Sequence, residues 1–256
     1  MRVLKGVIVL FMILLFSCGF SIFAYPYIHN YIVAKDMKEQ VQNFLDQLST
    51  DPTEHDNLPT EDPTALTEPA LPPREHEALW EEMLAYNQQI WAEKQAGLCD
   101  LWAYEQPSFT LGEYGLDDEI FGVISIPALE LEMPLYLGTT YQHMADGAAH
   151  LSQTSIPIGG DNTNAVIAGH RGWGGAAYFR YITELKPGDE VIITTLWETL
   201  TYLVAETQII WPHEVQKILI QEGRDLLTLL TCHPYASGGR QRYLVYCERT
   251  FTYATQ

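Results

Sequence analysis

A cysteine in the C-terminal half of the sequence has surroundings that fit thiol chemistry. Cys232 ends the β-prone run TLLTC, and Pro234 follows it two residues later. A thiol acts as a nucleophile in its thiolate form, so it needs a base or a cation nearby and a donor for the oxyanion of a tetrahedral intermediate. The sequence therefore presents Cys232 either as a small buried hydrophobe or as a nucleophile at the end of a strand.

Two histidines compete as the partner of this thiol. His233 is adjacent to Cys232, but neighbouring side chains on an extended strand point to opposite faces. His170 ends the strand-like run NAVIAGH, and the ends of strands are common places for functional side chains. Arg242 follows the cysteine by ten residues, across a Gly-bearing loop, and is expected to return antiparallel beside it. His170 and Arg242 are thus the candidate partners, with a structural role for each as the alternative.

Short strands must position these residues. From Ile120 onward the chain has at least seven β-rich runs, broken by Pro, Gly, Asp and Asn: FGVISIP, LEMPLYLG, NAVIAGH, DEVIITT, LTYLVAETQII, LLTLLTC and RYLVYCE. Strands at this spacing, without regular helices between them, predict a mainly β fold that is a closed barrel or a sandwich, and not a parallel α/β sheet. Only GGAAYFRYITEL, around Phe179, is expected to form a helical turn between strands.

The N-terminal segment is predicted to be a membrane anchor. Residues 6–27 carry no charge and are long enough to cross a hydrocarbon layer of ~30 Å as a helix. A cleaved signal peptide would have a shorter apolar region, and a lipoprotein signal ending at Cys18 would turn polar after the cysteine. Lys and Arg are balanced on the two sides of the span, but the free N-terminus and the acids after the span favour residues 1–5 as a short cytoplasmic end. The rest of the chain is then extracytoplasmic.

Four further segments follow the span. In residues 28–48, apolar side chains recur every three or four positions, which predicts an amphipathic juxtamembrane helix. Residues 49–73 are rich in Pro, Thr and acids and are predicted to be an extended linker. Residues 74–118 contain a second helix and a connection, and residues 119–253 form the β-domain.

Composition excludes several classes of function. Fourteen Lys and Arg against 33 Asp and Glu give a net charge of −19, which would repel a phosphate backbone and argues against a nucleic-acid partner. Only four cysteines occur, too few for a disulfide-dense scaffold, and whether Cys99 and Cys247 pair is left open. The histidines of the β-domain, which include His143, His150, His170 and His213, form no HExxH motif, and no paired cysteines at metal-binding spacing accompany them. No metal or other cofactor is therefore expected.

The cysteine motif closely resembles the signature of the sortases, membrane-anchored cysteine transpeptidases of Gram-positive bacteria. The TLxTC form is fulfilled by Thr228, Leu229, Thr231 and Cys232, and a Pro- and Gly-bearing loop then leads to RYLV. The resemblance extends over residues 119 to 250: GVISIPALELEMPLYLGTT is similar to the first barrel strands, and GAAHLSQTSIPIGGDNTNAVIAGHRG to the segment that delivers the histidine. GDEVIIT and LTYLVAE are similar to the strands that follow.

This resemblance implies a closed eight-stranded sortase-like β-barrel with N-terminal helices and one N-terminal transmembrane helix. It also implies a catalytic triad of His170, Cys232 and Arg242. Cys232 would attack the Thr–Gly carbonyl of an LPXTG-like sorting signal, His170 would protonate the leaving amine, and Arg242 would steady the oxyanion. An amine would then resolve the thioacyl intermediate.

The assignment to a subclass of sortases depends on shorter stretches of sequence. AHLSQTSIPIGG, the long N-terminal extension and AYNQQI (residues 85–90) are similar to class C sortases, which polymerise pilins. Those enzymes usually carry an Asp-Pro-aromatic lid over the active site. The nearest stretch here is CDLW, with Asp100 and Trp102 as lid candidates and Leu101 in place of the proline. The expected partners are therefore LPXTG-like proteins and an amine, which is a pilin lysine in class C or a cell-wall cross-bridge amine in a housekeeping enzyme.

Other readings of the same residues make different predictions. A papain-like hydrolase would place its cysteine before its histidine and at the start of a helix, whereas His170 precedes a strand-end Cys232. A non-catalytic, membrane-tethered β-domain used for adhesion would have an unreactive Cys232. The chain's own LPTED, residues 58–62, lacks the Thr-Gly of a sorting signal and is assigned to the linker.

Overall fold

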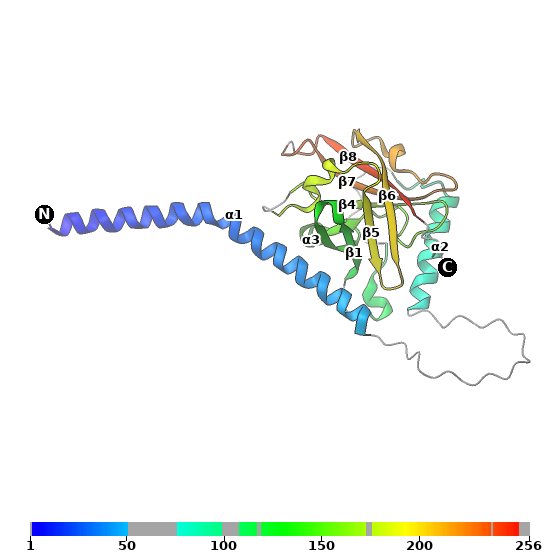
Figure 1. The fold of residues 1–256 in the computed structure, drawn as a ribbon, viewed down its shortest axis with the longest axis horizontal. Coiled ribbons are helices and arrows are strands. Elements are labelled where there is room, and N and C mark those ends of the chain that lie inside the picture. Colours follow the sequence, from blue (N-terminus) through cyan, green and yellow to red (C-terminus); the bar gives the residue numbers. More distant parts are fainter. Residues whose placement is uncertain are drawn as a thin grey trace, which may run out of the picture.

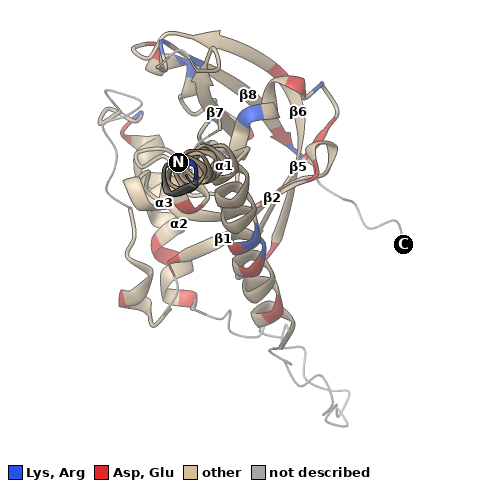
Figure 2. Cartoon of the chain, turned by 90° about the vertical axis from the view of Figure 1, so that its left-hand side faces the viewer, with Lys and Arg blue, Asp and Glu red and all other residues tan. Residues whose placement is uncertain are grey.

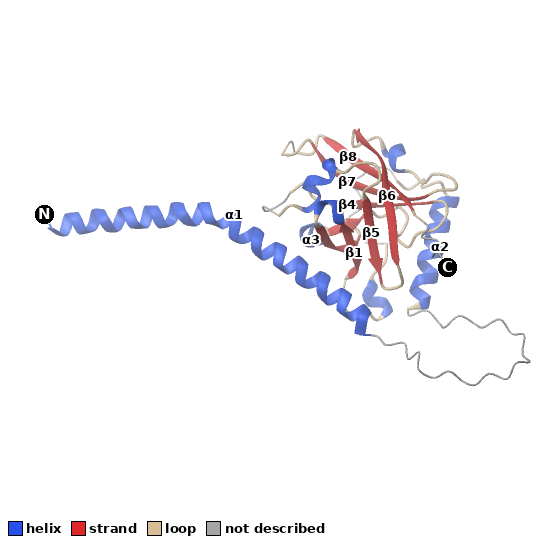
Figure 3. Cartoon of the chain, viewed as in Figure 1, coloured by secondary structure: helices blue, strands red, loops and turns tan. Residues whose placement is uncertain are grey.

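Eight strands close into a barrel in the order β1-β2-β3-β4-β7-β8-β6-β5 (Figure 1, Figure 3). The computed structural model describes residues 2–50, 76–98, 108–116, 119–172, 176–236 and 238–250. The strands are β1 Ile120–Ile126, β2 Leu131–Leu137, β3 Ala148–His150, β4 Thr163–Ala168, β5 Glu190–Thr195, β6 Thr199–Ile210, β7 Asp225–His233 and β8 Gln241–Arg249. The predicted closed eight-stranded barrel is confirmed.

Two parallel pairs interrupt an otherwise antiparallel barrel. β2 pairs with β3 and β4 pairs with β7 in parallel, while the remaining neighbours are antiparallel. Parallel strands end at the same edge of a sheet, so the residue that follows β4 and the last residues of β7 lie at one edge of the barrel. β8 begins at that edge too, because it runs antiparallel to β7.

The strands of this region are buried on both faces. Inward side chains such as Ile167, Leu229 and Val245 join the main core, whereas Leu230 and Leu244 pack in a second cluster on the opposite face. Strands covered on both faces need continuous apolar runs, and this explains why LLTLL shows no polar alternation. Burying each of these side chains contributes roughly 1.5–3 kcal/mol to the stability of the folded state.

The N-terminal residues form one continuous helix, α1, from Arg2 to Thr50, with Pro26 inside it. The sequence predicted a span in residues 6–27 and, in residues 28–48, an amphipathic helix that continues out of the membrane, and both segments lie within α1. In the described part of the chain, one helix is long and apolar enough to cross a membrane. Figure 2 looks along α1 from its N-terminal end. Met37, Val41 and Phe44 of its second half are buried against the β1–β2 side of the barrel.

Helix α2, Glu77–Ala92, covers another side of the barrel. Its buried face includes Asn87, whose side-chain amide donates to the carbonyl of Ile156 at 3.2 Å and accepts from the amide of Ile156 at 2.7 Å. Trp80 packs edge-on against Trp197, with ring centroids 5.1 Å apart. These contacts fix α2 to the loops of the barrel.

Short helical turns complete the fold. They are η1 Leu111–Tyr114, η2 Pro127–Leu129, α3 Tyr141–Asp146, η3 Tyr178–Glu184 and η4 Val215–Ile218. The predicted helical turn around Phe179 is η3. The predicted linker lies outside the described residues except for its first two positions, which are the last two of α1.

Candidate active site

Cys232 and Arg242 face each other across two neighbouring strands. The antiparallel register of β7 and β8 pairs these two residues directly, so their side chains project from the same face. The Arg242 side chain is buried, with 4% of its surface exposed. Its Nη1 donates to the carbonyl oxygens of Gly239 and Gln241, the latter at 2.9 Å. The guanidinium is therefore held by the loop that joins the two strands.

Gly239 lets this loop approach the thiol. A Cβ at position 239 would lie 3.2 Å from the Cys232 Sγ and 3.3 Å from the Arg242 Nη1, and the φ of Gly239 is +73°. A larger residue would strain the backbone and press on both functional groups at once. The glycine at position 239 thus has a steric reason.

His170 reaches the same edge through the parallel pairing of β4 and β7. The amide of Gly169 donates to the carbonyl of Leu230 at 3.1 Å, which extends the pairing to the residue before the histidine. The hydroxyl of Thr231 donates to the carbonyl of Gly169 at 2.7 Å and ties the two strand ends together. The amide of Phe179 donates to the His170 carbonyl at 2.9 Å. The structure brings the three predicted residues to one edge.

Burial shifts both titratable partners toward their neutral forms. Burial raises the pKa of the Cys232 thiol, and the positive charges of Arg242 and Arg171 counteract that rise in part. Burial also lowers the pKa of the His170 imidazole. Burial therefore favours the neutral form of each of the two groups.

Arg171 is a residue of this site that the sequence analysis did not single out. Its Nη1 lies 3.3 Å from the Cys232 carbonyl oxygen and 2.6 Å from Nδ1 of His233, and its Nη2 lies 3.4 Å from the Thr183 hydroxyl. It therefore joins the segment after β4 to the end of β7. Its position next to the candidate His170 was the available signal, because a residue adjacent to His170 in sequence lies at the same edge of the barrel.

His233 does not share the face of the thiol. Its Nδ1 faces Arg171, and its ring stacks on Tyr243 with centroids 5.9 Å apart. Burial, and next the charge of Arg171, lower its pKa. The neutral imidazole can then accept a hydrogen bond from the guanidinium, which is a positioning contact and not a proton-transfer contact to Cys232.

The other predicted positions have separate outcomes. The lid candidates Asp100 and Trp102 lie outside the described residues, as does Cys99. Cys247 is a free thiol buried inside the barrel, and burial raises its pKa to about 12. Over the described ranges, no three His, Cys, Asp or Glu side chains gather into a group that could hold a metal ion.

Comparison with known proteins identifies a matching family. The family model described as Sortase domain matches residues 124–250, which include His170, Cys232 and Arg242. Sortase D of Bacillus subtilis (strain 168) is 28% identical over 130 residues, which cover 50% of this chain and 63% of sortase D. The match thus spans less than two thirds of that relative's length.

Solved structures with the same fold extend the likeness beyond the barrel. Sortase C of Streptococcus pneumoniae is 28% identical, with a TM-score of 0.67, and the match covers 83% of this chain and 97% of that one. Sortase C-1 of Actinomyces oris is 31% identical, with a TM-score of 0.60, and the match covers 69% of this chain and 99% of that one.

Proposed function

This chain belongs to the sortase family, and we propose that it is a membrane-anchored cysteine transpeptidase. It would cleave an LPXTG-like sorting signal between Thr and Gly and transfer the new carboxyl end to an amine. The observation that carries the proposal is the direct pairing of Cys232 with Arg242, at the edge where His170 follows β4. A thiol, a base and a fixed cation are the three groups that acyl transfer requires.

The first half-reaction forms the thioacyl enzyme. The Cys232 thiol passes its proton to His170, and the thiolate attacks the carbonyl carbon of the Thr–Gly bond. A carbon–sulfur bond forms, and the negative charge on the carbonyl oxygen faces the Arg242 guanidinium. When the tetrahedral intermediate collapses, the carbon–nitrogen bond breaks and the His170 imidazolium returns the proton to the leaving glycine amine.

The second half-reaction reverses the roles. An acceptor amine attacks the thioacyl carbonyl, His170 accepts a proton from that nitrogen, and a new amide bond forms. The carbon–sulfur bond breaks, and the Cys232 sulfur leaves and takes a proton back from the imidazolium. Water in place of the amine would give hydrolysis instead of transfer. The ratio of the two products therefore depends on how well the acceptor is held.

A pilin lysine is the acceptor that we favour. The structure of sortase C from S. pneumoniae bears on the pilin substrate specificity of that enzyme, and the likeness to it covers most of both chains. The alternative within the family is a housekeeping enzyme that attaches proteins to a cell-wall cross-bridge amine. A purified lysine peptide and a purified cross-bridge peptide, offered together, distinguish the two by the product formed.

The anchor is part of the same proposal. Residues 6–27 of α1 would cross the membrane, with residues 1–5 in the cytoplasm and the barrel on the outer side. Residues 49–73 would act as a linker between α1 and α2, and Asp100 and Trp102 would form a lid. A protease added to intact cells should cut the barrel and leave a membrane-embedded N-terminal fragment if this orientation holds.

The chemistry is tested by trapping the intermediate. The full chain in detergent micelles is incubated with an LPXTG peptide, and mass spectrometry should find the acyl group on the peptide that contains Cys232. His170→Ala should prevent the adduct while leaving the melting temperature unchanged. An unmodified Cys232 that also resists a thiol alkylator in the folded protein would instead favour a non-catalytic adhesion domain.

A further inference from the structure

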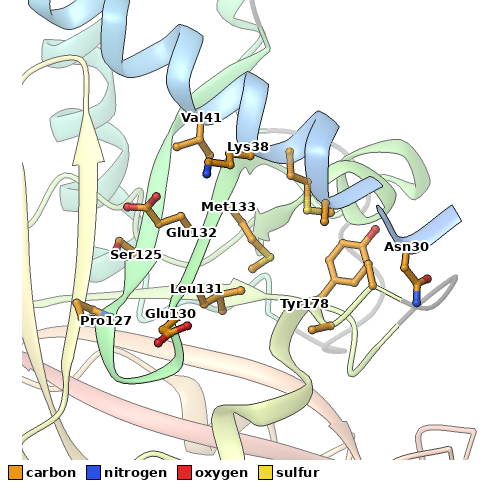
Figure 4. A pocket seen from close by; sticks show the side chains of 14 residues that line it. Asn30, Lys38, Val41, Ser125, Pro127, Glu130, Leu131, Glu132, Met133 and Tyr178 are labelled. Carbon is orange, nitrogen blue, oxygen red and sulfur yellow. The ribbon is translucent and has the colours of Figure 1, made fainter. Parts of the chain in front are cut away.

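A cavity of about 700 Å³ lies between the second half of α1 and the turn that joins β1 to β2 (Figure 4). This volume is in the range that holds a peptide side chain together with part of its backbone. Three separate segments line it, as Figure 4 shows. They are one face of α1 from Asn30 to Val41, the facing ends of β1 and β2 with their turn from Ser125 to Met133, and residues 176–178 at the start of η3.

One wall of the cavity also touches the catalytic histidine. Tyr178 lines the cavity, and its ring stands edge-on to the His170 ring with centroids 5.9 Å apart. Its hydroxyl donates to the carbonyl of Ala145 at 2.5 Å, and only 4% of the residue is exposed. Tyr178 is therefore held in place from both sides. Tyr178 therefore contacts both the cavity and the His170 ring.

The cavity has an apolar floor and an acidic rim. Met37 and Met133 are buried and reach the floor from opposite sides, and thioether side chains adapt well to different ligand shapes. Glu130 and Glu132 are exposed at the rim on the barrel side, and Lys38 is exposed on the helix side. Among the described residues, neither carboxylate forms an ion pair, with Lys38 or with any other cation.

This lining fits one kind of side chain. A lysine has an aliphatic stem that packs on apolar surface and an ammonium group that prefers carboxylate oxygens. The two carboxylates of Glu130 and Glu132 and the single ammonium of Lys38 give the rim a net charge of −1. An anionic or a wholly apolar ligand would leave these carboxylates unmatched.

We propose that this cavity is the docking site of the acyl acceptor, and that it binds a basic side chain next to the reacting lysine. The inference rests on the proposed function for the identity of the acceptor. The stem of the bound side chain packs on Met37 and Met133, and its ammonium lies between Glu130 and Glu132. The reacting amine stays outside the cavity, on the His170 side of Tyr178.

Binding is measured on the full chain in lipid nanodiscs, with Cys232→Ala to prevent turnover. Two fluorescein-labelled hexapeptides are compared by anisotropy: one has two lysines, and the other has norleucine in place of the second lysine. We expect the two-lysine peptide to bind about fivefold more tightly, as rim ion pairs are individually weak. The difference should shrink as salt is raised. Equal affinities for the two peptides would overturn the proposal.

Substitutions locate the effect. Glu130→Gln with Glu132→Gln should remove the preference for the second lysine, while the control pair Glu206→Gln with Glu222→Gln, also exposed, should keep it. Ala34→Trp fills the cavity from the exposed surface of α1 and should weaken the binding of both peptides. A preference that survives in the Glu130 and Glu132 variant would show that the ammonium binds elsewhere.

The active chain supplies a second readout. In the Glu130 and Glu132 variant, the ratio of transfer to hydrolysis should fall about fivefold. If the unchanged chain never cleaves the donor, the proposed function is wrong. The anisotropy comparison still shows whether the cavity binds a basic side chain. If phosphatidylethanolamine in the nanodisc abolishes the preference for lysine, the cavity belongs to a lipid headgroup and the proposal is wrong.

Discussion

Arg171 holds the backbone of Cys232 from the segment that carries His170: its Nη1 lies 3.3 Å from the Cys232 carbonyl oxygen. The same nitrogen lies 2.6 Å from Nδ1 of His233, so one guanidinium spans two consecutive residues of β7. The end of β7 and the segment after β4 are therefore joined by a side chain as well as by the backbone pairing of Gly169 with Leu230.

Replacing Arg171 by Met should slow both peptide cleavage and thiol alkylation. The charge of Arg171 counteracts the burial that raises the pKa of Cys232, so its loss should move the alkylation profile to higher pH. Displacement of the strand ends should lower the cleavage rate by on the order of tenfold. Arg171→Lys keeps the charge and should restore the pH profile but not the full rate. An unchanged profile in the Met variant would contradict this role.

Cys232→Ala should abolish cleavage, transfer and the thioacyl adduct, because it removes the nucleophile. Cys247→Ala is the matched control: that thiol is buried inside the barrel, with a pKa raised to about 12, and should resist alkylation in the folded protein. Its loss should leave the rate unchanged and lower the stability by roughly 1 kcal/mol through lost packing. Activity is measured by peptide cleavage and stability by chemical denaturation.

Arg242→Lys should retain the fold and lose most of the cleavage activity. A lysine ammonium supplies charge, but it cannot donate to the loop carbonyls and to a developing oxyanion with the planar geometry of a guanidinium. We expect kcat to fall about a hundredfold or more, in line with the loss of one oxyanion donor. A rate equal to that of the unchanged chain would reduce Arg242 to a structural residue.

Acid should destabilise the barrel through His150. This residue is fully buried, its Nε2 lies 3.1 Å from the Thr154 hydroxyl, and burial lowers its pKa from 6.5 to about 4. In the unfolded chain His150 binds a proton below about pH 6.5, whereas in the folded chain it does so only below about pH 4. Stability is complete above this window and falls by up to about 1.4 kcal/mol per pH unit within it. The melting temperature of His150→Gln should depend less on pH over the same range.

The lid candidates give a prediction that depends only on the sequence. If Asp100 and Trp102 cover the thiol, Asp100→Ala with Trp102→Ala should speed the alkylation of Cys232 and leave the melting temperature nearly unchanged. An exposed ion pair contributes only ~0–1 kcal/mol, so such a lid would open readily. Unchanged alkylation would exclude a lid at these residues, and an unfolded variant would assign Trp102 to the core.

The strands, and the placement of the three candidate residues at strand ends, could be predicted because their signals are local. TLLTC, NAVIAGH and RYLVYCE each combine a β-prone run with a reactive side chain near one end. The three-residue strand β3 was missed because a run as short as AAH has no period to detect. The role of Arg171 depends on contacts with residues 61 and 62 positions away, which only the parallel pairing of β4 with β7 brings close.

If the apolar half of α1 crosses a bilayer, the continuity of this helix limits how far the barrel can lie from that bilayer. The helix passes without a break from its apolar half to Val41, which is buried against the barrel. At a rise of about 1.5 Å per residue, the distance along the helix from Tyr27 to Val41 is roughly 20 Å. A helix of this length, packed on the barrel at one end and embedded in lipid at the other, would permit rotation and lateral diffusion but little movement of the barrel away from the membrane. Substrates would have to present their cleavage site within that thin layer, so the spacing between a substrate's own membrane anchor and its sorting signal becomes a selection rule.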